Sequence, residues 1–114
     1  MKKIKPKFFK TDSGHEPVRD WLLNLSRENK KKIGENIKLT EYGWPLGMPV
    51  CRPLGGGLYE VRVSLAQGRI ERVIFCIEGD QMVLLHGFLK KSQKTPEKVL
   101  NLARNRRKVL KDDS

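Results

Sequence analysis

The stretch from Leu58 to Pro96 decides the fold, because three runs within it alternate between apolar and polar side chains. The runs read LYEVRVS (58–64), RIERVIFCIEGD (69–80) and QMVLLHGFLKKSQKTP (81–96). Successive side chains of a β-strand point to opposite faces of a sheet, so this alternation predicts three strands. The third strand is expected to lead into the start of a helix.

The alternation also predicts that one face of this sheet is apolar and that the other carries charged groups. The apolar rows are Tyr59, Val61 and Val63; Val73, Phe75 and Ile77; and Val83, Leu85 and Leu89. In the third strand, this row alternates with Leu84, His86 and Phe88. The face opposite the apolar rows then collects one carboxylate, two guanidiniums and one imidazole, from Glu60, Arg62, Arg72 and His86. We expect the function to depend on this cluster.

The length and charge of the chain limit the classes of function. With 114 residues, the chain is expected to form a single domain, 1–114. Its net charge of +11 predicts a polyanionic partner, most often a nucleic acid. The alternative is an ordinary protein surface with solvated lysines.

The composition gives no sign of a membrane segment or of a metal site. No stretch approaches the roughly 20 apolar residues that a transmembrane helix needs, so we expect a cytoplasmic protein without membrane contact. The two cysteines, Cys51 and Cys76, are read as free thiols in a reducing compartment. Together with His15 and His86 they show no zinc-ligand spacing, so no metal is expected.

The residues on either side of the three strands predict further elements. The segment Met1–Lys10 is read as an edge strand in which Pro6 limits pairing. One helix is expected to open at Glu16–Pro17, and a second from Arg27 to about Glu41, capped by Ser26. These two helices are expected to form an αα-hairpin across the sheet.

The remaining segments are read as a loop and a last helix. Residues 42–57 contain three prolines and five glycines and are interpreted as a loop. Thr95 is expected to cap the last helix, and Pro96 to start it. The sequence therefore predicts an α+β fold with a largely antiparallel four-stranded sheet, an N-terminal αα-hairpin and a C-terminal helix.

Three motifs resemble those of a known family. They are GLYEVR (57–62), RVIF (72–75) and FLKKSQKTP (88–96), and with the order of the elements the likeness extends from about residue 5 to 105. The chain resembles the phage-derived HigB-like toxins of the RelE/ParE superfamily. Several members of that superfamily use a tyrosine near the C-terminus, whereas the tyrosines of this chain are Tyr42 and Tyr59.

The resemblance implies a RelE-like fold and the toxin of a type II toxin–antitoxin pair. Such a toxin is an endoribonuclease, or mRNA interferase, that cleaves messenger RNA, usually on the ribosome, and so inhibits translation. The implied partners are the ribosome, the mRNA and an acidic, HigA-like antitoxin with a helix-turn-helix domain. No cofactor is implied.

Metal-free RNA cleavage requires a base for the 2′-hydroxyl, cations for the phosphorane and an acid for the 5′-oxygen. Guanidiniums bind phosphate through two nitrogens and stay charged, so Arg62 and Arg72 are predicted to stabilise the transition state. Glu60 is the candidate general base, and a structural salt bridge is its alternative role. His86 is a candidate acid or base, and its alternative is a hydrogen-bonded core residue.

Further cations and one aromatic residue are candidates for holding RNA. Of Lys90, Lys91 and Lys94, one is expected to contact the scissile phosphate, with Lys90 as the catalytic candidate, and the others the RNA backbone. A solvated turn is the alternative reading. Trp44 is a candidate for stacking on a base and Arg107 for binding the backbone.

Two rival functions remain open beside the endoribonuclease. One is a basic RNA- or DNA-binding module without catalysis, and the other is an inactive toxin fold that still binds its antitoxin. Exposure of the charged cluster separates them, because a catalytic cluster must reach solvent and a structural network is buried.

Overall fold

The computed structural model describes residues 3–90 and 94–112. The elements are β1 (Lys5–Phe8), α1 (Pro17–Leu23), α2 (Arg27–Gly43), β2 (Cys51–Gly55), β3 (Leu58–Ser64), the 3-10 turn η1 (Ala66–Gly68), β4 (Ile70–Glu78), β5 (Gln81–Lys90) and α3 (Glu97–Asp112). The predicted helix starts at Pro17 and Arg27 are confirmed. Ser26 caps α2, because its hydroxyl accepts a hydrogen bond from the Asn29 N–H at 3.1 Å.

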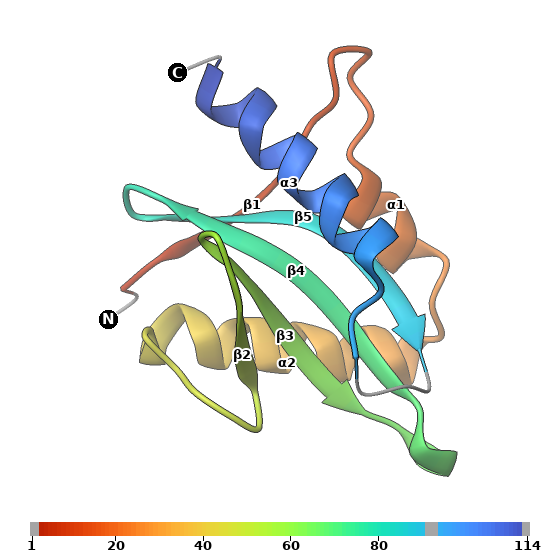
Figure 1. The fold of residues 1–114 in the computed structure, drawn as a ribbon. Coiled ribbons are helices and arrows are strands. Elements are labelled where there is room, and N and C mark those ends of the chain that lie inside the picture. Colours follow the sequence, from red (N-terminus) through yellow and green to blue (C-terminus); the bar gives the residue numbers. More distant parts are fainter. Residues whose placement is uncertain (1–2, 91–93, 113–114) are drawn as a thin grey trace.

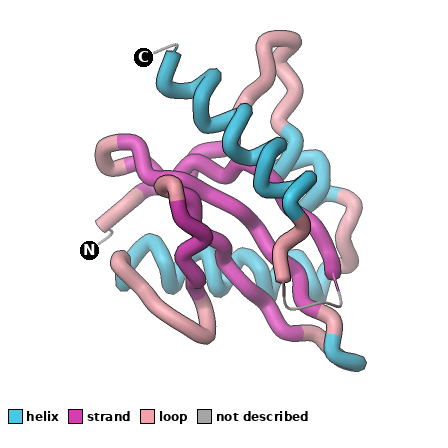
Figure 2. The backbone as a smooth tube through the Cα atoms, viewed as in Figure 1, coloured by secondary structure: helices cyan, strands magenta, loops and turns pink. Residues whose placement is uncertain are grey.

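The strands form a five-stranded mixed sheet in the order β1-β5-β4-β3-β2 (Figure 2). β1 runs parallel to β5, and the other neighbours are antiparallel. The prediction of four strands is therefore wrong, because residues 51–55 of the expected loop pair with β3. Pro53 is tolerated there since β2 is an edge strand and its register shifts between Pro53 and Gly55.

Helices lie on both faces of the sheet (Figure 1), and each face has its own apolar cluster. On one face, α1 and α2 pack against the sheet through side chains such as Val18, Ile33 and Ile37. On the other face lies α3, whose Ala103 is fully buried against strand residues. The charged cluster lies on this second face, at the end where α3 begins.

The predicted αα-hairpin is not formed as expected. α1 has only seven residues and packs mainly on β5, where its Trp21 ring lies against Gly87. The longer α2 packs mainly on β3. The two helices cover the same face of the sheet. Each packs mainly on the sheet rather than on the other helix, because their apolar stripes face different strands.

β5 contains a bulge that changes the predicted alternation. Ile74 pairs with His86 and Phe75 pairs with Leu84, so Leu85 is an extra residue between them. Leu84 packs on the α1–α2 side, whereas Phe88 packs on the α3 side. The expectation that Leu84 shares a face with His86 and Phe88 is therefore wrong, because an inserted residue reverses the alternation.

Both thiols are free and buried. Burial raises the pKa of Cys51, and burial together with the nearby Glu78 carboxylate raises the pKa of Cys76 to about 11. Within residues 3–90 and 94–112, none of the helices has the length and apolar character needed to cross a membrane.

Candidate functional site

The candidate site is built from two rows of residues that cross the sheet on its α3 side. Arg62 pairs with Arg72, which pairs with Phe88. One row further along, Glu60 pairs with Ile74, which pairs with His86. The sheet register therefore brings the predicted Glu60, Arg62, Arg72 and His86 to one face.

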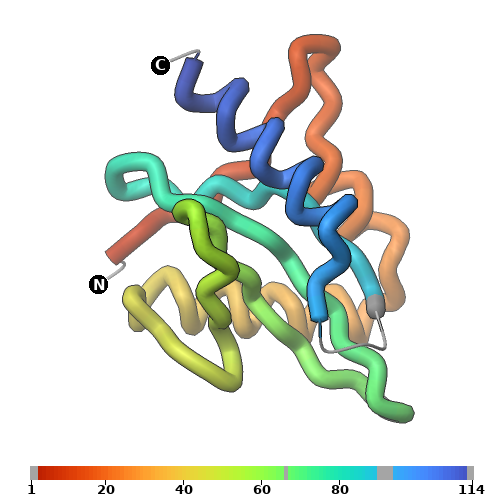
Figure 3. The backbone as a smooth tube through the Cα atoms, in the orientation of Figure 1, coloured from red at the N-terminus to blue at the C-terminus, as the bar shows by residue number. Residues whose placement is uncertain are grey.

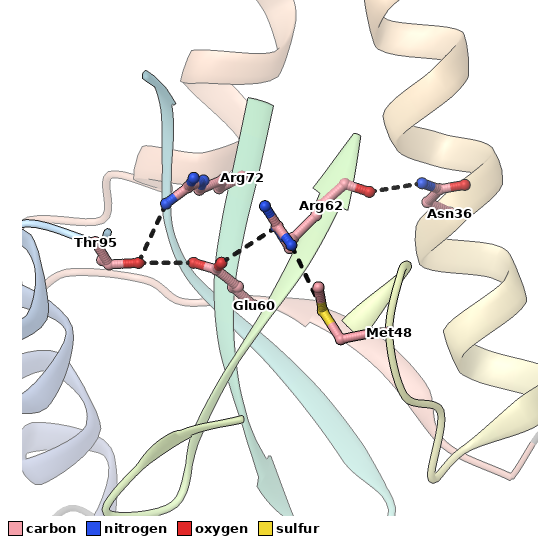
Figure 4. A network of polar contacts seen from close by, with 6 residues as sticks. All are labelled: Asn36, Met48, Glu60, Arg62, Arg72 and Thr95. Atoms are coloured by element: carbon pink, nitrogen blue, oxygen red, sulfur yellow. Dashed lines mark hydrogen bonds and ion pairs between the residues drawn. The ribbon is translucent and has the colours of Figure 1, made fainter. Parts of the chain in front are cut away.

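The centre of the site is a buried network of side chains from three elements (Figure 4). The Thr95 hydroxyl, just before α3, donates to Glu60 Oε2 at 3.0 Å and accepts from Arg72 Nη1 at 3.4 Å. Arg62 Nε lies 3.6 Å from Glu60 Oε1. Thr95 therefore ties the start of α3 to β3 and β4.

Two members of this cluster are closed to solvent, as expected of a structural network and not of groups that contact a substrate. Glu60 and Arg72 both have an exposed fraction of 0%, and Thr95 has 5%. The sequence indicates which face these residues occupy, but it does not indicate that Thr95 contacts Glu60 and Arg72 on this face. The hydroxyl of Thr95, which was expected to cap α3, is bonded to Glu60 instead, and the helix begins at Glu97.

The electrostatics of the site reflect one buried carboxylate among several guanidiniums. Burial lowers the pKa of Arg72, and the Glu60 carboxylate opposes this shift. The nearby charges of Arg62 and Arg52 lower the Arg72 pKa further. Because arginine keeps its proton in proteins, we treat Arg72 as charged and balanced mainly by Glu60.

Arg52 belongs to the site but was missed in the sequence. It pairs directly with Glu60 from β2 and is partly exposed. It lies in the stretch that Pro53 and the glycines led us to read as a loop. The alternation of Cys51, Arg52 and Pro53 is too short to indicate a strand by itself.

Arg62 is held at the border between the network and solvent. Its side chain has an exposed fraction of 11%, and its Nη1 donates to Met48 Sδ at 3.5 Å. Its backbone is fixed on both sides, because its N–H donates to Val50 O at 2.8 Å and its carbonyl accepts from Asn36 Nδ2 at 2.8 Å. This support makes Arg62 a rigidly placed cation (Figure 4).

His86 lies on the same face but is separated from Glu60 by β4. It is half-buried, stacks on Phe88 with ring centroids 5.8 Å apart, and its Nδ1 lies 3.5 Å from Arg106 Nη1. Burial lowers the pKa of His86, and the Arg106 charge lowers it further. The imidazole is therefore neutral at pH 7, as a general base must be.

The three lysines after β5 are only partly described. Lys94 is exposed and directly precedes Thr95, so its backbone lies beside the buried network. Lys90 ends β5, but its side chain lies outside the described residues, as does the whole of Lys91. Their predicted roles remain predictions.

The structure does not bring Trp44 or Arg107 to this site. The Trp44 ring packs edge-on against Tyr59 and Phe75, at centroid distances of 4.9 and 5.5 Å, on the α1–α2 side. Arg107 packs against Gly57 at the turn that precedes β3. Gly57 lies five residues before Arg62, which corresponds to about 16 Å along a strand. Arg107 is therefore at the other end of β3 from Arg62.

Comparison with known protein families gives a match. The model of the Gp49-like family of phage-derived proteins (DUF891) matches residues 20–108, which is more than half of the chain. The chain belongs to the Gp49-like family. This family is associated with toxins of the RelE/HigB type from toxin–antitoxin pairs. A search of curated proteins gives no match.

In this Gp49-like protein, the matched residues include the whole network from Glu60 to Thr95. No group of three or more His, Cys, Asp or Glu side chains that could hold a metal ion occurs in the part of the chain that the structure describes. What the site offers is a buried carboxylate, fixed guanidiniums and a neutral imidazole nearby. Of these groups, the guanidiniums can bind and polarise a phosphodiester.

Proposed function

We propose that this Gp49-like protein is the toxin of a type II toxin–antitoxin pair and a metal-independent endoribonuclease that cleaves mRNA on the ribosome. Its inhibitor would be an acidic, HigA-like antitoxin with a helix-turn-helix domain. The toxin association of the family and the net charge of +11 support this function.

The observation that carries the proposal is a set of cations at the border of the buried network. We call Arg52, Arg62 and Lys94 the cationic rim. Arg52 on β2 pairs with Glu60, and Arg62 lies two residues from Glu60 on β3. Lys94 directly precedes Thr95, which is bonded to Glu60. Fixed cations stabilise charge that develops on a phosphorane, because they need no reorganisation when the reaction occurs.

The buried residues receive a different role from the one expected in the sequence. Glu60 and Arg72 do not reach solvent, so we assign them to positioning Arg62 and Thr95 rather than to contact with RNA. Arg62 and Lys94 are assigned to the phosphate. His86 is the proposed base, since its pKa is lowered by burial and it is only half-buried.

The test is single-turnover cleavage of mRNA on programmed ribosomes. Arg62→Ala is expected to lower the rate by about 10² to 10³, because a phosphate contact is lost in the transition state. Arg62→Lys should recover only part of this loss, since an ammonium cannot bind two phosphate oxygens with a fixed fork. Lys38→Ala, on the exposed side of α2, is the matched control and should cleave at the wild-type rate. Wild-type cleavage by Arg62→Ala would refute the assignment.

The burial of Glu60 and Arg72 favours one alternative, a toxin-fold binding module without catalysis. The same experiment decides between the two functions. A folded wild-type protein that binds ribosomes or RNA tightly and leaves the message intact would establish the binding module.

A further inference from the structure

The strand β1 forms a free edge of the sheet, on the side away from β2. The N–H groups of Lys5 and Phe9 donate to the carbonyls of Asp80 and Leu84, at 2.8 and 3.0 Å. Backbone groups alternate in direction along a strand, so Pro6 and Phe8 present theirs to the free edge. Pro6 has no N–H to leave unpaired, and Phe8 offers both an N–H and a carbonyl.

An apolar groove follows β1 on the α3 side of the sheet. It has a volume of about 310 Å³ and is lined by apolar side chains that include Phe9, Val83 and Leu110. Lys7 and Lys10 lie at its wall, and Glu16 is the acidic residue that lines it. Figure 3 shows the red N-terminal segment running beside β5 and below the end of α3.

A second groove follows the same strand on the opposite face of the sheet. It has a volume of about 290 Å³ and lies between β1 and the helices α1 and α2. Phe8, Leu22 and Ile37 line it, and the buried Glu41 lies among them. One edge strand is therefore flanked by an apolar groove on each face.

The surface around this edge is strongly basic. Lys3, Lys5, Lys7 and Lys10 are all exposed within eight residues of the chain. Asp80 lies 3.9 Å from Lys5 and offsets one of these four charges, so the exposed strand stays basic. An occupant of this edge must therefore be acidic.

We propose that the β1 edge is the docking site for an extended acidic segment of a partner protein, with apolar residues at alternate positions. Such a segment adds to the sheet as a sixth strand through the outward groups of Pro6 and Phe8. Alternate side chains of a strand share a face, so the apolar residues enter the groove between β1 and the helices α1 and α2, and the acidic residues lie on the α3 side, where Lys7 and Lys10 line the other groove. This inference deepens the partner part of the proposed function and is independent of RNA cleavage.

The edge is distinct from the cationic rim. β5 and β4 lie between β1 and the strand that carries Arg62. A segment that binds along β1 therefore does not contact Arg62. A nucleic acid strand fits this edge poorly, because a phosphodiester cannot donate a hydrogen bond to the Phe8 carbonyl and does not fill an apolar groove.

The test uses a twelve-residue peptide of alternating valine and glutamate with the full chain. A peptide of alternating valine and lysine is the charge control. The acidic peptide is expected to slow hydrogen exchange at the Phe8 amide and to bind about tenfold more tightly than the lysine peptide. The double variant Lys5→Glu/Lys7→Glu should weaken binding about tenfold, and the matched control Lys30→Glu/Lys31→Glu, on exposed residues of α2, should not.

Four results would overturn the proposal. They are no binding of the acidic peptide up to about 1 mM, equal binding of the two peptides, protection of amides elsewhere than Phe8, and stronger protection of Phe8 by single-stranded RNA. Loss of cleavage is not among the readouts, and Lys5→Glu/Lys7→Glu should cleave mRNA normally. Failure of this docking site is thereby distinguished from failure of the proposed enzyme.

Discussion

At the scale of single residues, Glu60 shows how one buried charge can organise a basic site. Its two carboxylate oxygens face Thr95 and Arg62, and its charge offsets the burial of Arg72. A buried guanidinium without this carboxylate would be strongly unfavourable. Glu60 therefore compensates the buried and half-buried cations around it, which is a structural role.

The variant Glu60→Gln keeps the shape of the side chain and removes its charge. It is expected to lower the free energy of unfolding by about 3 kcal/mol, because buried arginine charge is left uncompensated. Urea denaturation measures this change, and cleavage per folded molecule should stay within a few-fold. Glu35→Gln on the exposed side of α2 is the control and should change stability by less than about 0.5 kcal/mol. Unchanged stability with a large loss of cleavage would restore Glu60 as the general base.

At the scale of elements, α2 supports the site from the other face of the sheet. Asn36 holds the carbonyl of Arg62, and seven residues earlier Asn29 Nδ2 donates to Glu71 Oε1 at 3.3 Å. Glu71 neighbours Arg72 on β4 but faces α2, and its exposed fraction is only 1%. Two asparagines of α2 thus hydrogen-bond to β3 and β4 on the face of the sheet opposite the Arg62 and Arg72 side chains.

This contact predicts a pH dependence of stability. Burial raises the pKa of Glu71, although Asn29 and the charges of Arg69 and Lys32 oppose the shift. The folded state then favours the protonated carboxyl, so its contribution to stability is greatest at acidic pH and falls as pH rises through the ordinary glutamate pKa toward the raised one. Glu71→Gln keeps an acceptor for Asn29 and should be more stable than wild type at pH 7.

Urea denaturation between pH 4 and 8 checks this prediction. The advantage of Glu71→Gln over wild type should grow with pH, whereas Glu35→Gln should follow the wild-type curve. A Glu71→Gln protein that is less stable than wild type at pH 7 would show that the ionised carboxylate is well compensated by Arg69 and Lys32.

The elements that the sequence predicted correctly are those with strong local signals. β3 has the predicted bounds, and α2 begins after its capping serine, since alternation and capping act over a few residues. β2 was missed because its strand character comes from pairing with β3, while Pro53 and the glycines favour a loop. The bulge at Leu85 and the burial of Glu60 under Thr95 also depend on contacts between distant residues, so no local pattern shows them.

At the scale of the whole molecule, the net charge of +11 does not by itself say where a polyanion binds. Cations occur along β1, on α2, on α3 and on the cationic rim. Attraction between this protein and RNA is expected from all of them at low salt. Direct phosphate contacts are fewer, and each of them releases counterions when it forms.

The salt dependence of RNA binding therefore locates the contacts. For single-stranded RNA, the logarithm of the binding constant falls with the logarithm of salt concentration by about 0.7 for each phosphate contact. The variant Arg62→Ala/Lys94→Ala should flatten this slope by about 1.4, because two contacts are lost. Lys30→Ala/Lys31→Ala removes the same charge from exposed residues of α2 and should leave the slope unchanged. Fluorescence anisotropy between about 50 and 200 mM salt measures both. If the α2 pair flattens the slope and the rim pair does not, RNA crosses α2, and the cationic rim is not its binding site.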